Sequence, residues 1–377
     1  MMRAAEEAVG LTDWGRDIFR RPFEVLIEDL NTTARLTPLG AERAYRRLFE
    51  TLCARLGVIA ERKRRPEIAA EQITRPIFVT GLPRAGTTFF HNLLSADPAN
   101  RSPLTWEIMY PSPAPEEETY ESDPRIAKAA EAMAFEGFMA DDLLAVHPFD
   151  ARRPEECNFI WELSFLSVNY AAWWNVPDYA ALLYNVDFTD VYEEEREVLQ
   201  LLQSRRRRDR WVLKTPAHIA WMDALLAVFP DALFVQCHRD PAKIIPSLSN
   251  NLTIWRRTFS DDVAPSDFGM MEHQAEGLRK LSALRARPGM ADRFFDAHYL
   301  DVQADPIGAL SACYRQFDVD LTPEREAQVR RWMEDDRAAH AKGPKHAYAL
   351  QDFGLDLAKI DRIYADYFAD FGVAKER

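Results

Sequence analysis

The residues between positions 75 and 98, RPIFVTGLPRAGTTFFHNLLSADP, combine glycines, hydroxyl residues and arginine in a pattern that suits an anion. The apolar run 76–80 predicts a buried strand, and 87–95 predicts a helix because its apolar residues recur at helical spacing. Gly81 and Gly86 belong to the turn between them. A strand, a glycine turn and a helix aim backbone N–H groups and a positive helix end at one point. The stretch therefore predicts a site for a phosphate-like group, against the simpler interpretation of a plain connecting turn.

The spacing Gly81-x-x-x-x-Gly86-Thr87-Thr88 matches a nucleotide-binding Walker A loop except at one position. A kinase has a lysine where Thr87 stands, because that ammonium reaches the β and γ phosphates. Here the cation is Arg84, two residues before the second glycine. The loop is thus predicted to hold a phosphate-like group without the part that handles a triphosphate. The alternative is a P-loop kinase of small molecules or nucleosides with a displaced lysine and Thr88 as its metal ligand.

The sequence PRAGTT after a strand resembles the 5'-phosphosulfate loop of sulfotransferases that use 3'-phosphoadenosine-5'-phosphosulfate (PAPS). Within that family it is most similar to the bacterial branch related to tyrosylprotein and carbohydrate sulfotransferases, and the resemblance covers roughly residues 73–371. It implies that PAPS is the co-substrate and that no metal takes part. It also implies the residues that bind the 5' end of the donor, namely Arg84, Ala85, Gly86, Thr87 and Thr88.

Three further residues match the family pattern. Lys214 closes the apolar run 211–215, and a lysine at the carboxyl end of a strand is placed to stabilise the leaving nucleotide. Arg239 follows another apolar run, with Ser247 eight residues later, and the resemblance implies that this pair binds the 3'-phosphate. A guanidinium fork and a helix-borne hydroxyl suit a terminal dianion. The resemblance also implies a late loop that closes over the nucleotide, assigned here to Lys342 and Gly343.

The general base that removes the acceptor proton has three candidates. Glu107 lies just beyond the first strand–helix unit, where connections of a parallel sheet return over its ligand-binding edge. The resemblance to the tyrosylprotein branch favours it, against the interpretation of a surface acid. The cytosolic sulfotransferases place a histidine two residues after the strand-end lysine, but Pro216 stands there in this chain. His218 and His147 are the other candidates.

The elements that position these residues alternate between strand and helix. Strands are predicted at 76–80, 211–215, 232–237 and 294–302, with helices between them. This alternation predicts an α/β fold with a P-loop-like, doubly wound parallel sheet flanked by helices. Residues 1–72 are predicted to form a helical N-terminal extension. Residues 73–377 are predicted to form the sulfotransferase-like domain, with an aromatic, helical acceptor-side insertion at about 116–204.

The insertion contains a stretch rich in aromatic residues, at 159–187. These rings form either core or the wall of an apolar acceptor pocket. The chain has 377 residues and a net charge of −13, which disfavours nucleic acid and polyanionic acceptors. We therefore expect a hydroxyl or amine of a small molecule, lipid or glycan as the acceptor. A non-catalytic nucleotide-binding relative is the remaining alternative.

The sequence shows no apolar run long enough to span a membrane and no apolar signal segment at positions 1–10. The four cysteines are far apart and lack metal-ligand spacing. The expectation is therefore a cytoplasmic protein with no integral membrane segment. A homo-oligomer is compatible with the helical N-terminal extension.

Overall fold

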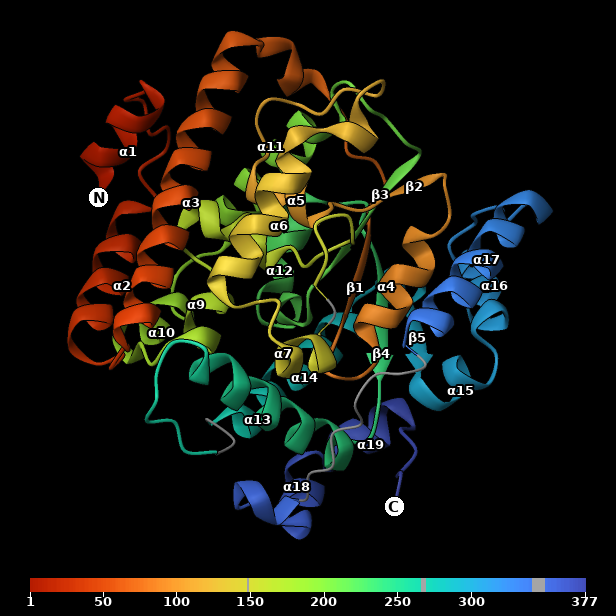
Figure 1. Cartoon of the computed structure of the whole chain (residues 1–377). Coiled ribbons are helices and arrows are strands. Elements are labelled where there is room, and N and C mark those ends of the chain that lie inside the picture. The colour runs from red at the N-terminus through yellow and green to blue at the C-terminus, as the bar shows by residue number, and fades with distance from the viewer. Residues whose placement is uncertain (148, 266–268, 341–349) are drawn as a thin grey trace. The chain divides into compact units, whose positions relative to one another are not determined.

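The computed structural model describes residues 1–147, 149–265, 269–340 and 350–377 (Figure 1). The chain divides into two compact units. The first unit comprises Met1–Ile73, Pro103–Arg207 and Ile254–Val263. The second unit comprises Thr74–Ser102, Arg208–Thr253 and Ala264–Arg377. The first unit thus contains the N-terminal residues together with residues from the middle of the chain.

The second unit is built on a five-stranded sheet in the order β2-β3-β1-β4-β5. All neighbouring strands pair in parallel. The strands are β1 (Ile77–Gly81), β2 (Asn100–Arg101), β3 (Arg210–Lys214), β4 (Leu233–His238) and β5 (Phe294–His298). Every residue of β1 and β4 is buried, as the near-continuous apolar runs of a sheet covered on both faces require. The predicted doubly wound parallel sheet is confirmed.

Two details of the sheet differ from the expectation. The predicted strand 294–302 ends at His298, and the helix α15 (Tyr299–Ala304) begins at the next residue. His298 is paired with His238, the last residue of β4, so the chain leaves the sheet where its partner strand ends. The two-residue strand β2 was not predicted, because a strand of this length has no periodicity to detect.

Helices flank this sheet in the second unit, and Figure 1 shows α15, α16 and α17 lying beside the end of β5. The α-helices are α4 (Thr87–Ser95), α12 (Met222–Val228), α13 (Pro241–Arg257), α14 (Met270–Arg285), α15, α16 (Pro306–Gln316), α17 (Pro323–His340), α18 (Leu357–Ile363) and α19 (Ala365–Phe371). The 3-10 helices are η4 (Pro216–Trp221), η5 (Ala291–Arg293) and η6 (Leu350–Phe353). The last residues of α13 are assigned to the first unit.

The described parts of the first unit are helical, and Figure 1 shows α1, α2 and α3 side by side. Its α-helices are α1 (Met2–Val9), α2 (Arg20–Thr32), α3 (Pro38–Arg64), α5 (Thr105–Met109), α6 (Pro124–Glu136), α7 (Asp141–Val146), α8 (Asn158–Trp161), α9 (Val168–Trp173), α10 (Pro177–Leu183) and α11 (Thr189–Gln203). Its 3-10 helices are η1 (Pro66–Ala70), η2 (Tyr120–Ser122) and η3 (Glu162–Ser164).

The aromatic stretch of the first unit packs as core. Trp161, Tyr170, Trp174 and Tyr179 are among the largest fully buried side chains of the molecule. The rings of Tyr170 and Trp174 stack with centroids 5.4 Å apart. Such close ring packing adds to the free energy gained from burying apolar area. Of the two interpretations of this stretch, core packing therefore holds for these rings.

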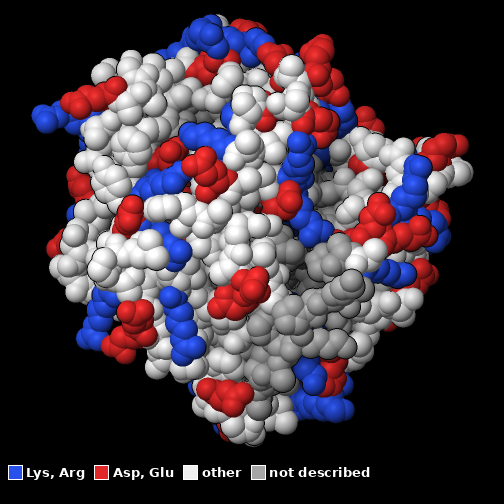
Figure 2. Space-filling model, viewed as in Figure 1, with Lys and Arg blue, Asp and Glu red and all other residues white. Residues whose placement is uncertain are grey.

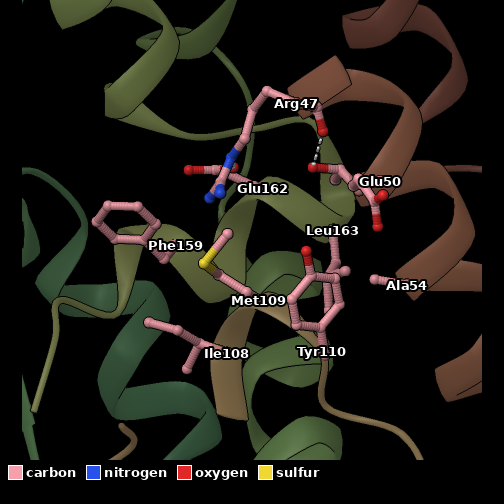
Figure 3. A pocket seen from close by; sticks show the side chains of 10 residues that line it. Arg47, Glu50, Ala54, Ile108, Met109, Tyr110, Phe159, Glu162 and Leu163 are labelled. Carbon is pink, nitrogen blue, oxygen red and sulfur yellow. Dashed lines mark hydrogen bonds and ion pairs between the residues drawn. The ribbon is translucent and has the colours of Figure 1, made fainter. Parts of the chain in front are cut away.

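A buried ion-pair network also holds the first unit together. Arg47, on α3, donates to Glu162 through Nε at 2.7 Å and pairs with Glu136 at 3.5 Å. Figure 3 shows the small pocket that adjoins this network, with Met109 lying between the rings of Phe159 and Tyr110. A buried guanidinium without its carboxylates would be strongly destabilising, so these groups must assemble together.

A second buried carboxylate of the first unit predicts how stability depends on pH. Glu195, on α11, is fully buried, accepts a hydrogen bond from the indole of Trp161 at 2.7 Å, and burial raises its pKa to about 7. The folded protein therefore keeps a proton that the unfolded chain releases above its ordinary pKa. We expect the free energy of unfolding to fall as the pH rises from about 4.5 to about 7, by roughly 3 kcal/mol from this group.

Urea unfolding at pH 5 and pH 8 measures this effect. The Glu195→Gln variant, which keeps the hydrogen-bond acceptor and removes the charge, should lose less stability between the two pH values than the parent. Glu42→Gln, at an exposed position of α3, is the matched control and should behave like the parent. Equal pH dependence in the parent and in Glu195→Gln would contradict the assignment.

Candidate active site

The loop between β1 and α4 owes its shape to two glycines with positive φ. Gly81 has a φ of 131°, and a Cβ there would lie 2.4 Å from the carbonyl oxygen of Cys237 on the neighbouring strand. Gly86 has a φ of 96° and is the N-cap residue of α4. Only glycine adopts both conformations without strain. The loop therefore ends at a helix N-terminus whose first N–H groups lack partners within the helix, the arrangement predicted for an anion site.

Arg84, in the middle of this loop, also has a positive φ, of 69°. Its Nε donates to the hydroxyl of Ser247 at 3.2 Å. Ser247 is buried on α13, the helix that follows Arg239. The structure thus brings together the loop and the helix-borne serine, which are 163 residues apart in the chain.

Lys214, at the carboxyl end of β3, is almost fully buried and lies next to the same loop helix. It is paired across the sheet with Val79 of β1, two residues before Gly81. Its Nζ donates to the Thr88 hydroxyl at 3.4 Å. The ammonium therefore lies beside the first turn of α4, the helix whose N-terminus forms the anion site.

Arg239, immediately after β4, lies against a tyrosine and an acidic side chain. Its guanidinium carbon lies 3.8 Å from the ring centroid of Tyr299, and cation–π contact of this kind holds the plane of the fork. Its Nε and Nη2 donate to the two carboxylate oxygens of Glu376 at 3.1 and 3.3 Å. Arg239 is thus engaged in an ion pair with Glu376.

A small pocket adjoins the loop within the second unit. It is lined by Ala85, Gly86, Cys237, Ala297 and Tyr299, among other residues. A Cβ on Gly86 would approach the Tyr299 ring to 3.2 Å, so a larger residue there would press on this ring. The pocket, the loop and the Arg239 side chain therefore share Tyr299 as a common wall.

Two of the base candidates are fully buried. Glu107 belongs to the first unit and its side chain accepts a hydrogen bond from the backbone N–H of Leu104 at 2.9 Å, which caps α5. His218 belongs to the second unit, its ring packs edge-on against Phe78 at 4.9 Å, and burial lowers its pKa to about 3. Both side chains are closed off from solvent, so a structural role in the folded protein accounts for each of them as well as a catalytic role does.

His147 differs from these two because it pairs with a carboxylate and keeps some exposure. Its Nε2 lies 2.8 Å from Oε2 of Glu155, which is buried. A carboxylate accepts, so Nε2 is the donor in this contact. The backbone around Glu155 is fixed to the start of α5, since Glu155 N donates to Pro103 O and Thr105 N donates to Arg153 O. The histidine is therefore held by a rigid carboxylate partner within the first unit.

Two predicted residues cannot be placed, and two others went unpredicted. Lys342 and Gly343 lie outside the residues that the structure describes. Tyr299 was read as part of a strand, although the pairing of His238 with His298 puts it beside Arg239. Glu376 gave no signal in the sequence, because nothing local indicates which acid of a chain reaches a given arginine.

The described residues also bear on metals and membranes. Within them, no group of three or more histidine, cysteine, aspartate or glutamate side chains is arranged to hold a metal ion. None of the helices described combines the length and the apolar character needed to cross a bilayer.

Comparison with known proteins shows that this chain is similar to sulfotransferases. The profile of the sulfotransferase family matches residues 76–323. The crystal structure of sulfotransferase STF1 from Mycobacterium tuberculosis H37Rv is 34% identical, with a TM-score of 0.83 over 97% of each chain. That of sulfotransferase STF9 from Mycobacterium avium is 30% identical, with a TM-score of 0.88 over 100% of this chain and 96% of the other.

A curated relative carries a more specific name. The omega-hydroxy-beta-dihydromenaquinone-9 sulfotransferase Stf3 of Mycobacterium tuberculosis is 27% identical over 295 residues, which are 73% of this chain and 70% of the relative. The family profile spans all five strands of the second unit's sheet together with the loop, Lys214 and Arg239. The resemblance inferred from PRAGTT is confirmed: the chain belongs to the sulfotransferase family and is an enzyme of that type.

Proposed function

We propose that this enzyme transfers a sulfuryl group from PAPS to a hydroxyl group of a lipid-like acceptor. The observation that carries the donor assignment is the meeting of three cations, Arg84, Lys214 and Arg239, at the carboxyl ends of adjacent strands around one helix N-terminus. PAPS carries phosphate at both ends of its nucleotide, and cations spaced along one sheet edge suit such a molecule.

Each group has a distinct role in the proposal. The N–H groups of Ala85 to Thr88 and the guanidinium of Arg84 bind the 5'-phosphate. Lys214 neutralises the negative charge that grows on the oxygen bridging phosphorus and sulfur as the bond between this oxygen and sulfur breaks. Arg239 and Ser247 bind the 3'-phosphate. The protein forms no covalent bond with the sulfuryl group in this proposal. Most of the rate enhancement therefore comes from positioning the donor and the acceptor and from stabilising charge in the transition state.

The general base takes the proton from the acceptor oxygen as the new bond to sulfur forms. We assign this role to His147, because a buried carboxylate fixes its proton on Nε2 and because it keeps partial exposure. Glu107 and His218 remain the alternatives, with Glu107 supported by the resemblance to the tyrosylprotein branch. In this proposal the late loop with Lys342 and Gly343 also binds the nucleotide.

The acceptor class rests on two observations. The name of the relative Stf3 states that it acts on a hydroxylated menaquinone derivative, an apolar lipid with a terminal hydroxyl. On the face drawn in Figure 2, acidic and basic side chains are interspersed, which offers a polyanion no broad basic surface there. Both favour an apolar alcohol over a sulfated or phosphorylated glycan. We propose a cytoplasmic setting for the reaction, because the four cysteines are far apart in the sequence and lack the spacing of a disulfide framework or a metal site.

Binding of adenosine 3',5'-bisphosphate (PAP), measured by calorimetry without magnesium, tests the donor assignment. We expect saturable binding to the parent, weakened about 10- to 100-fold in Arg239→Ala, because a charged hydrogen bond contributes about 1.5–3 kcal/mol. Lys243→Ala, at an exposed position on α13, is the matched control and should bind like the parent. Magnesium-dependent binding of ATP with no binding of PAP would instead support the P-loop kinase.

A further inference from the structure

Arg239 already holds a bidentate carboxylate in this structure. Both oxygens of Glu376 accept hydrogen bonds from the guanidinium, at 3.1 and 3.3 Å, although the two residues are 137 positions apart. Two parallel N–H groups facing two oxygens is the geometry with which an arginine also binds a phosphate. The carboxylate therefore occupies the hydrogen-bonding edge that the 3'-phosphate would need.

The segment that carries Glu376 is held by one backbone contact and by the side chains of its neighbours, all within the second unit. The Glu376 N–H donates to Asp240 Oδ2 at 2.8 Å, and the other oxygen of Asp240 accepts from Ala242 N at the start of α13. On either side of Glu376, Lys375 and Arg377 both donate to Asp361 on α18. The Asp240 carboxylate thus ties the segment 375–377 to the very helix that carries Ser247.

The environment of the pair makes it more than a surface contact. The side chains of Arg239 and Glu376 are 24% and 14% exposed, and Tyr299 covers one face of the guanidinium. Exposed ion pairs contribute little, whereas partly buried bidentate pairs are stronger because water competes less. An anion that displaces this carboxylate from Arg239 must therefore carry a higher charge than the carboxylate, as a terminal phosphate dianion does.

We propose that Glu376 is an internal competitor for the 3'-phosphate: its carboxylate holds Arg239 in the nucleotide-free enzyme and must leave when a 3'-phosphorylated nucleotide binds. The inference rests on the proposed function of Arg239. It makes Glu376 a positioning residue that keeps the guanidinium oriented, lowers the affinity for PAP and assists product release by returning to Arg239. The Glu376 side chain alone has to rotate, because the contacts of segment 375–377 with Asp240 and Asp361 do not involve its carboxylate.

Calorimetry with PAP and with adenosine 5'-monophosphate tests this proposal in four forms of the full chain: the parent, Glu376→Gln, Arg239→Ala and the double variant. Glu376→Gln should bind PAP about 10-fold more tightly than the parent, since the ion pair no longer has to be broken. Its affinity for adenosine 5'-monophosphate, which has no 3'-phosphate, should not change. In the Arg239→Ala background the same substitution should have no effect on PAP. Glu276→Gln, an exposed glutamate on α14, is the matched control.

The possible results separate the two proposals. If PAP binds the parent and Arg239→Ala weakens it, but Glu376→Gln leaves the affinity within twofold of the parent, the competitor role is overturned and the donor site stands. Equal tightening for both nucleotides would also overturn it, because the effect would not depend on the 3'-phosphate. If PAP binds neither the parent nor Glu376→Gln, both proposals are overturned. Thermal melting of each variant establishes that the compared forms are folded.

Discussion

Lys214→Met is expected to lower kcat by at least about 100-fold while KM for PAPS changes by less than about threefold. The ammonium lies beside the first turn of α4, 3.4 Å from the Thr88 hydroxyl, where charge would develop on the departing nucleotide. Its interaction with that oxygen strengthens only as the bond to sulfur breaks, so its loss affects the transition state more than the ground state. Steady-state kinetics with varied PAPS measures both constants.

Methionine is chosen because Lys214 is almost fully buried, and an unbranched side chain of similar length fills the space that alanine would leave. Lys243→Met, at an exposed position of α13, is the control for the same exchange of residue and the same loss of one positive charge. Parent-like turnover in Lys214→Met, with an unchanged melting temperature, would remove Lys214 from the mechanism. A rise in KM for PAPS with unchanged kcat would make it a binding residue only.

His147→Gln is expected to lower kcat by about 100- to 10,000-fold, the usual contribution of a positioned general base. The reason is the pair with Glu155, which engages Nε2 and leaves Nδ1 as the ring nitrogen that would take the proton of the substrate hydroxyl. Glu155→Gln should lower kcat less than His147→Gln, because it disturbs the orientation of the imidazole without removing it. Calorimetry with PAP should give parent-like affinity for both variants, since neither group belongs to the donor site.

His273→Gln, at an exposed position of α14, is the matched control for loss of a histidine. Glu107→Gln decides between the candidates. Should it abolish turnover with an unchanged melting temperature while His147→Gln turns over like the parent, the base would be Glu107. A loss of activity in Glu107→Gln that accompanies a lower melting temperature would instead reflect its cap on α5.

The sequence by itself determined the sheet and the loop. Apolar runs long enough for one strand, each followed by a helical pattern, specify parallel pairing because both faces of such a strand must be covered. The positions of Gly81 and Gly86 specify the loop, since other residues adopt such backbone angles only with strain. Arg84 and Lys214 were identified from these patterns as residues in the loop and at a strand end, whereas Arg239 and Ser247 were identified from the resemblance to the sulfotransferase family.

The tertiary structure decided the contacts between residues that are distant in the chain. Neither the aromatic core of the first unit nor the pairing of Arg47 with its carboxylates is encoded in a local pattern, because burial depends on which segments pack together. The same holds for Tyr299 and Glu376. Tyr299 contacts Arg239 because β5 pairs with β4, and Glu376 contacts it from the segment that follows α19. Local sequence fixes backbone shape through sterics, whereas the partner of a charged side chain is fixed by the fold as a whole.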